Sequence, residues 1–170
     1  HELSPLLTAR FIEVLGQVGG PASVTELSQQ LNNESPLIRS TAAAALGQLG
    51  PVASPAVSQL LPNLAEDKEA RVRSAAAAAI GSIGVESSMA ADTLRLAVTN
   101  DENVSVAVSA AEALLEIVDA RSLGQEVSRL LADKRPEVAT VAMSAVAAQK
   151  QGAVSLLRQA LSDPASRIKA

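Results

Sequence analysis

Few residues in this chain could do chemistry. Among its 170 residues there is no Cys, Trp or Tyr, and the one His is residue 1. Without Cys the chain has no thiolate nucleophile, no disulfide and no Cys-ligated metal site. A lone His at the start of the chain also gives no basis for zinc ligation or imidazole acid–base catalysis. We therefore expect a protein that is not an enzyme and that holds neither a cofactor nor a metal.

Two other patterns resemble chemical motifs. The pair Glu112/Glu116 has the residue type for general acid–base catalysis, but its spacing is ordinary for a solvated helix face. The pair Gly47-x-x-Gly50 resembles part of a phosphate loop, yet it follows a predicted helix and no Gly-Lys-Ser/Thr comes after it. We interpret such glycines as helix caps and as points of close helix packing.

Charge and hydropathy exclude two classes of partner. The chain has 14 basic and 18 acidic residues and a formal net charge of −4, which argues against a nucleic-acid binder with a basic face. No apolar stretch approaches the roughly 18–20 residues that span a bilayer, so we expect no membrane insertion. We expect a cytoplasmic protein, with an extracytoplasmic mature chain as the alternative, because a lack of Cys is compatible with both.

An internal repeat dominates the sequence. Three segments align with one another: SPLLTARFIEVLGQVGG (4–20), SPLIRSTAAAALGQLGP (35–51) and EARVRSAAAAAIGSIGV (69–85). Two weaker copies follow at 103–119 and 135–151. One apolar position recurs at intervals of 31, 34, 34, 32 and 30 residues, at Leu7, Ile38, Val72, Val106, Val138 and Ile168. A period in this range is typical of a helical solenoid.

Each copy predicts a helix with one apolar stripe, which we call the B helix. In the third copy the stripe consists of Val72, Ala76, Ala79, Ile80 and Ile83. These steps keep the side chains within about 100° on a 3.6-residue helix. Phe11 aligns with Ala42 of the second copy, so we expect it in the core. Prolines predict the first turn of the helix, at Pro5, Pro36 and Pro136, and glycines predict left-handed caps at its end, at Gly19, Gly50 and Gly84.

A shorter helix, the A helix, is predicted between successive B helices. Its mark is an apolar pair four residues apart, at Leu27/Leu31, Leu60/Leu64, Leu94/Val98, Val127/Leu131 and Leu157/Leu161. Each unit is then an A helix, a short acidic turn and a B helix, and neither helix can bury its apolar side without neighbouring units. We expect one domain over 1–170 with about five repeats, bounded at 1–20 (partial), 21–51, 52–85, 86–119, 120–151 and 152–170 (partial).

The segment LLPNLAEDKEARVRSAAAAAIGSIG (60–84) resembles a HEAT repeat. The resemblance rests on the Pro in the A helix, the acidic turn, the Val-x-x-x-Ala stripe and the terminal Ile-Gly. It implies an all-α fold, a right-handed α-solenoid of stacked antiparallel helix pairs like the HEAT and armadillo superhelices. The Ala-rich B helix resembles the short bacterial form, which also occurs in phycobilisome lyase subunits. The likeness weakens after residue 100, where Leu115 and Val118 replace the two glycines.

The resemblance also implies a structural ladder, in which an acidic turn residue pairs with a basic residue six positions later. The pairs with this spacing are Asp67/Arg73, Asn33/Arg39 (with an uncharged partner) and Asp163/Lys169. We expect Arg39 and Arg73 to satisfy turn carbonyls and a carboxylate. Asp101 and Asp133 have alanines six positions later, so we interpret these two as helix N-caps.

The remaining surface is the side of the B helices opposite the stripe, which would line the concave side of a solenoid. Its residues are small, and those expected to bind a partner are Leu37, Arg71, Val108, Glu112 and Leu115. We predict a scaffold or protein–protein interaction module whose partner is another protein or further repeats of the same chain. Two alternatives stay open: a subunit of a bilin lyase or isomerase, and a regulatory repeat segment of a larger signalling protein. Because neither terminal unit has a polar cap, we expect an excised piece of a longer array, or ends buried against a partner or another copy.

Overall fold

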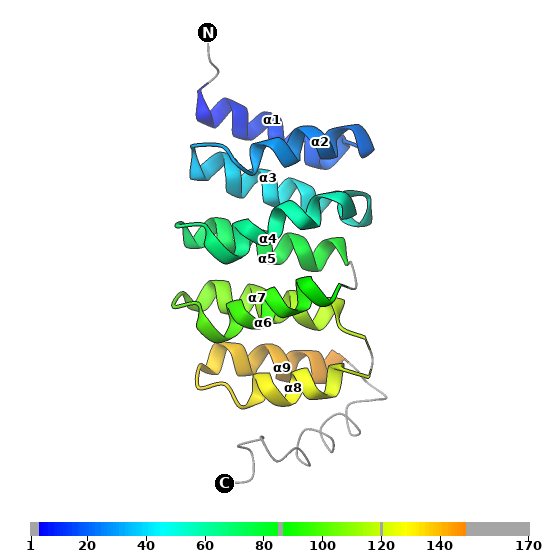
Figure 1. The fold of residues 1–170 in the computed structure, drawn as a ribbon, viewed down its shortest axis with the longest axis vertical. Coiled ribbons are helices and arrows are strands. Elements are labelled where there is room, and N and C mark those ends of the chain that lie inside the picture. Colours follow the sequence, from blue (N-terminus) through cyan, green and yellow to red (C-terminus); the bar gives the residue numbers. More distant parts are fainter. Residues whose placement is uncertain (1–3, 85–86, 120, 149–170) are drawn as a thin grey trace. The chain divides into compact units, whose positions relative to one another are not determined.

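A computed structural model describes residues 4–84, 87–119 and 121–148, and the regular structure in those ranges is helical (Figure 1). The helices are α1 (Pro5–Val18), α2 (Pro21–Gln30), α3 (Pro36–Gln48), the 3-10 helix η1 (Gly50–Ala56), α4 (Val57–Glu66), α5 (Ala70–Ile83), α6 (Ser88–Asn100), α7 (Val104–Ile117), α8 (Leu123–Leu131) and α9 (Pro136–Ala148). The predicted all-α fold is confirmed. The last partial repeat, with Ile168 and the pairs Leu157/Leu161 and Asp163/Lys169, lies outside the described residues.

The helix starts follow from local sequence. Pro5, Pro36 and Pro136 occupy the first positions of α1, α3 and α9, where a missing N–H breaks no helical hydrogen bond. Ser4 caps α1 by accepting a hydrogen bond from the Leu7 N–H at 3.4 Å, and Ser87 caps α6 in the same way from Ala90. The predicted proline positions are therefore confirmed.

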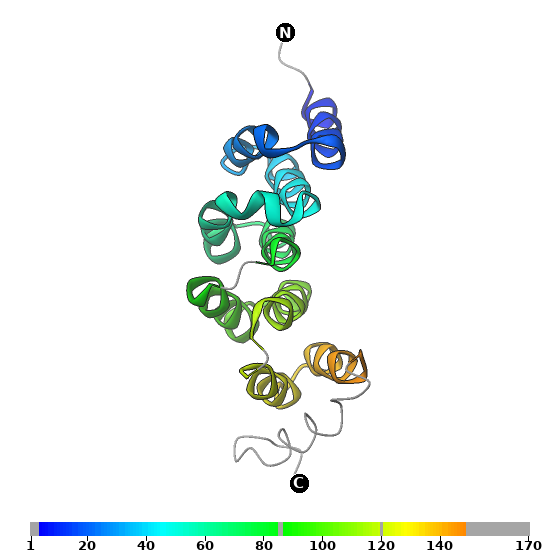
Figure 2. The ribbon, with the colours of Figure 1, turned by 90° about the vertical axis from the view of Figure 1, so that its right-hand side faces the viewer.

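The chain forms two compact units, 1–117 and 118–170. In the first unit, Figure 2 shows the B helices α1, α3, α5 and α7 in one row and the A helices α2, α4 and α6 in a second row. Each of these A helices packs on the B helix that follows it, and each B helix packs on the next. This repeating arrangement is that of a HEAT α-solenoid. In the second unit α8 packs on α9.

The predicted stripes form the core of the first unit. All five stripe residues of α5 are buried, and Val72, Ala76 and Ile80 have no exposed surface. From the opposite row, Leu27, Leu60 and Leu94 are also fully buried. Burying a side chain of this size contributes about 1.5–3 kcal/mol. The two rows therefore hold each other through aliphatic contacts, as the spacing predicted.

The prediction that Phe11 lies in the core is wrong. Its side chain is 59% exposed, whereas the aligned Ala42 has no exposed surface. The two side chains differ in exposure because their helices have different neighbours. Helix α2 packs on α3 and covers its stripe, but no A helix precedes α1 in the part of the chain that the structure describes. The apolar stripe of α1 is consequently open.

The glycines that were predicted to cap helices divide into two groups. Gly50 and Gly84 have φ values of 58° and 70°, so they form the predicted left-handed turns. Gly19 has φ −75° and ψ 166°, so the prediction for it is wrong. After Gly19 the chain runs directly through Gly20 into α2, which begins at Pro21, and that path needs no left-handed turn.

Other glycines let neighbouring B helices approach closely. A Cβ atom added at Gly16, Gly47 or Gly81 would lie 2.8, 3.0 or 2.8 Å from the Cα atom of Ala45, Ala79 or Ala113. Because the obstructing atom is backbone in each case, a side chain could fit only if the two helices moved apart. The interpretation of Gly47 as a packing glycine is therefore confirmed.

Candidate protein-interaction surface

Two arginines each connect one repeat to the next. Arg39 on α3 donates from Nε and Nη2 to the two carboxylate oxygens of Asp67, at 2.7 and 2.9 Å. Its Nη1 donates to the backbone carbonyl oxygens of Asn33 and Glu34, at 2.9 and 3.1 Å. Asn33 thus contributes its carbonyl and not its side chain, which explains why an uncharged residue serves at this position.

Arg73 on α5 repeats this arrangement one unit later. It donates to the carboxylate of Asp101 at 2.6 and 2.9 Å and to the carbonyl oxygen of Asp67 at 2.8 Å. The side chains of Arg73 and Asp101 are only 19% and 7% exposed. The structure therefore brings Arg39, Asp67 and Arg73 together, as a ladder in which each arginine reaches the aspartate of the next repeat.

The prediction that Asp101 and Asp133 are helix N-caps is wrong. Asp101 ends α6 and accepts from Arg73 and from the N–H of Asn103. Asp133 accepts from the backbone N–H and the guanidinium of Arg135, which precedes α9. The guanidinium that pairs with Asp101 is that of Arg73, 28 residues earlier in the chain, so a spacing of six residues does not indicate it.

The ladder changes the pKa of its members. Burial raises the pKa of the Asp67 carboxyl, but hydrogen bonds from Arg39 and from the Glu69 N–H outweigh burial and hold it below the ordinary value of 3.8. The hydrogen bond to Asp101 raises the pKa of the Arg73 guanidinium. Asp67 and Arg73 are therefore both charged at neutral pH, the first held by Arg39 and the second by Asp101, which leaves these ladder residues a structural role.

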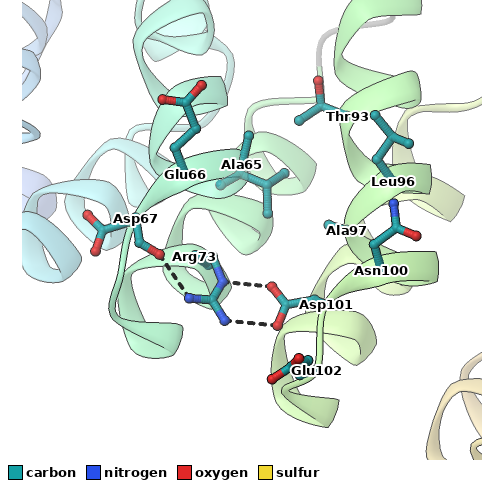
Figure 3. A pocket seen from close by; sticks show the side chains of 11 residues that line it. Ala65, Glu66, Asp67, Arg73, Thr93, Leu96, Ala97, Asn100, Asp101 and Glu102 are labelled. Carbon is teal, nitrogen blue, oxygen red and sulfur yellow. Dashed lines mark hydrogen bonds and ion pairs between the residues drawn. The ribbon is translucent and has the colours of Figure 1, made fainter.

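An open hollow of about 480 Å³ lies beside this ladder, between the end of α4 and α6 (Figure 3). Arg73 lies at its base, bonded to Asp101 and to the Asp67 carbonyl, and Leu96 and Asn100 line the α6 side. Among residues 4–84, 87–119 and 121–148 no group of three or more His, Cys, Asp and Glu is placed to hold a metal ion. The polar groups at the base of the hollow already satisfy one another.

The five residues predicted to bind a partner lie on three neighbouring B helices of the first unit. Leu37 is on α3, Arg71 is on α5, and Val108, Glu112 and Leu115 are on α7. Arg71 and Glu112 are exposed, and the three apolar side chains are partly buried. We call this open side of α3, α5 and α7 the B-helix face.

Short side chains cover most of the B-helix face. Ala44 and Ala78 are exposed there, and Ser74 and Ser109 share a hydrogen bond of 2.8 Å between α5 and α7. Gly81 is buried between α5 and α7 against Ala113 and does not contribute to the face. The B-helix face is therefore a surface of short side chains that runs across the closely packed helices α3, α5 and α7.

Sequence reasoning missed the most apolar exposed surface of the first unit. Five large hydrophobic side chains of α1 are between 51% and 77% exposed: Leu6, Leu7, Phe11, Val14 and Val18. The signal was present, because the first copy has a B-helix stripe without a preceding A helix. Because the residues of α1 align with buried positions in the other copies, they were expected to be buried as well.

Comparison with known proteins supports the repeat assignment. Residues 2–81 match the family model described as HEAT repeats, which are generally protein-interaction scaffolds. No curated protein matches the sequence. In the described ranges, no helix is long and apolar enough to cross a bilayer.

Proposed function

We propose that this chain is a non-enzymatic scaffold that binds another protein along its B-helix face. One observation carries the proposal: α3, α5 and α7 pack at glycine–alanine contacts, so their open sides form one continuous surface with few long side chains. A partner backbone can approach such a surface closely, as in the recognition of a helix in a groove.

The chemistry of the face suits a protein partner. Leu37, Val108 and Leu115 are only partly covered, and apolar groups of this kind form the desolvated centre of many interfaces. Arg71 and Glu112 are exposed, and neither side chain has an ion pair or hydrogen bond within the described part of the chain. These opposite charges could orient a partner that carries complementary groups.

Affinity capture from the native lysate tests the proposal. We expect the wild-type chain to retain a protein that the variant Val108→Glu/Leu115→Glu does not retain, because two carboxylates would be buried in the interface. The matched control is Met89→Glu/Leu96→Glu, which alters two apolar residues of α6 that are 65% and 61% exposed. Equal recovery with both variants would contradict binding at the B-helix face.

A second variant separates binding from folding, because Val108 and Leu115 are partly buried. The exchange Arg71→Glu/Glu112→Arg reverses two exposed charges and should leave the helical circular dichroism and the melting temperature unchanged. We expect it to slow association and to change the salt dependence of binding. Unchanged kinetics would place the partner elsewhere.

A further inference from the structure

One repeat before the hollow beside the ladder, a side chain connects two A helices. Asn63 on α4 is buried and donates from Nδ2 to the backbone carbonyl of Leu31 at 2.9 Å. Leu31 is the second residue of the apolar pair of its repeat, and Asn63 stands directly before the second residue of the next pair. One amide therefore joins α4 to the residue that ends α2.

The next repeat lacks this amide. Ala97 on α6 stands 34 residues after Asn63, and Leu64 holds the place that Leu31 holds one repeat earlier. Ala97 and Leu64 both line the hollow of about 480 Å³, together with Leu96, which is 61% exposed (Figure 3). The hollow thus lies where an asparagine amide connects the two preceding A helices.

Leu64 offers an acceptor to a hydrogen-bond donor in the hollow. Helix α4 ends at Glu66, so the carbonyl of Leu64 belongs to its last turn, whose carbonyls have no helical partner. Within the described ranges no turn N–H and no side chain donates a hydrogen bond to this carbonyl. The C-terminal end of a helix carries a partial negative charge, so a positively charged donor is favoured here.

The side-chain charges around the hollow favour the same kind of ligand. Arg39 and Arg73 neutralise the two aspartates of the ladder. Two further carboxylates, Glu66 and Glu102, also line the hollow, and both residues are exposed. Neither of them forms an ion pair within the part of the chain that the structure describes. The edge of the hollow is therefore negatively charged.

We propose that the hollow binds a lysine side chain of a partner protein. The ammonium group would take the role that the Asn63 amide has one repeat earlier and would donate to the Leu64 carbonyl. Glu66 and Glu102 would balance its charge, because hydrogen bonds and charge reinforce each other in such a pair. The apolar stem of the lysine would lie along Leu96.

The hollow suits a lysine within a polypeptide better than a free amine. Asn100 is exposed on the α6 side of the hollow, and its amide can both donate to and accept from the peptide groups beside a bound lysine (Figure 3). The hollow lies in the row of A helices, whereas the B-helix face belongs to α3, α5 and α7. The inference therefore does not rest on the proposed function.

Titration with small probes, followed by the NMR shifts of the α6 amides, tests the site on the full chain. The probe is the capped tripeptide acetyl-Gly-Lys-Gly-amide. We expect it to bind about tenfold more tightly than the same peptide with an Nε-acetylated lysine, because acetylation removes the charge. We also expect tighter binding than that of n-butylamine, which lacks the peptide groups. Equal affinity of the acetylated peptide or of n-butylamine would overturn the inference.

The variant Ala97→Asn restores the missing amide and changes no charge. We expect it to keep the helical circular dichroism of wild type and to weaken binding of the tripeptide about tenfold, because the internal amide would occupy the Leu64 carbonyl. The matched control is Ala44→Asn, at an exposed alanine of α3, which should bind as wild type does. A general attraction of cations to this acidic chain would survive both substitutions, so equal binding by both variants would contradict a site in the hollow.

A second variant keeps the test independent of any effect of Ala97→Asn on folding. Glu66→Gln/Glu102→Gln alters two exposed side chains and should leave the melting temperature unchanged. We expect it to weaken binding of the tripeptide roughly threefold, as the loss of two exposed ion pairs would. Unchanged affinity would show that these carboxylates do not receive the ammonium group and would overturn the inference.

Discussion

Arg39 and Arg73 show what a single residue contributes to this array. Each guanidinium joins carbonyls of its own repeat to the carboxylate of the next, so one side chain connects two turns. The resemblance to HEAT repeats implied that these arginines satisfy turn carbonyls, and the carbonyls lie five and six residues earlier in the chain. It did not predict the contact with Asp101, because that partner depends on how the repeats stack.

Removing Arg73 should destabilise the first unit. The substitution Arg73→Ala removes the guanidinium that donates to the carboxylate of Asp101, which is 7% exposed and keeps the Asn103 N–H, and to two turn carbonyls. We expect a loss of about 2 kcal/mol in the free energy of unfolding, measured by denaturant titration. The matched control is Arg71→Ala on the same helix, where the side chain is exposed and the loss should stay below about 0.5 kcal/mol. Similar losses of unfolding free energy for both variants would show that the ladder does not stabilise the first unit.

Asp67 should make stability depend on pH in the acid range. Its pKa in the folded chain lies below 3.8, so its contribution is fully present above that value and is lost as the pH falls through the folded pKa. We therefore expect wild type to be more stable than Asp67→Asn at pH 7, with the difference shrinking below about pH 4. Paired denaturation curves at pH 7, 5 and 3 measure this. A constant difference would show that the charge of Asp67 is not what stabilises the ladder.

At the scale of the helix, periodicity predicted which side of each B helix is apolar, but it could not predict what covers that side. The stripe of α5 is buried because α4 lies on it, whereas the aligned stripe of α1 is open. Phe11 was misplaced for this reason. A side chain is buried only where another element packs on it, and the sequence of one helix does not specify that other element.

The spacing between B helices depends on their glycines. In Gly81→Ala the new Cβ would lie 2.8 Å from the Cα atom of Ala113, so α5 and α7 must separate. Alanine gains about 1 kcal/mol of helix propensity, but overpacking against backbone costs about 1–3 kcal/mol. We expect a net loss of about 1 kcal/mol in thermal unfolding. Gly20→Ala is the control, since nothing lies within 4 Å of its added Cβ, and a stabilised Gly81→Ala would contradict the close-packing account.

For the whole molecule, stacking makes stability local. In a repeat array each element contacts only its near neighbours. A destabilising substitution therefore lowers the stability of the helices packed around it and not of the entire chain. The first unit extends to Ile117, shortly after Leu115 takes the position of Gly47 and Gly81. The sequence predicted one domain over 1–170, and the weaker likeness to the repeat after residue 100 did not indicate that a first unit ends at Ile117.

A core deletion tests whether the two units unfold separately. Ile80 has no exposed surface, and its helix α5 packs on α3, α4 and α7, so Ile80→Ala should cost about 2–5 kcal/mol. We expect hydrogen exchange to accelerate throughout α3, α5 and α7 while the amides of α8 and α9 keep their wild-type rates. Leu96→Ala, at a side chain that is 61% exposed, should alter neither set. If α8 and α9 accelerate together with α5, the units unfold as one cooperative body, because exchange through a shared global opening responds equally everywhere.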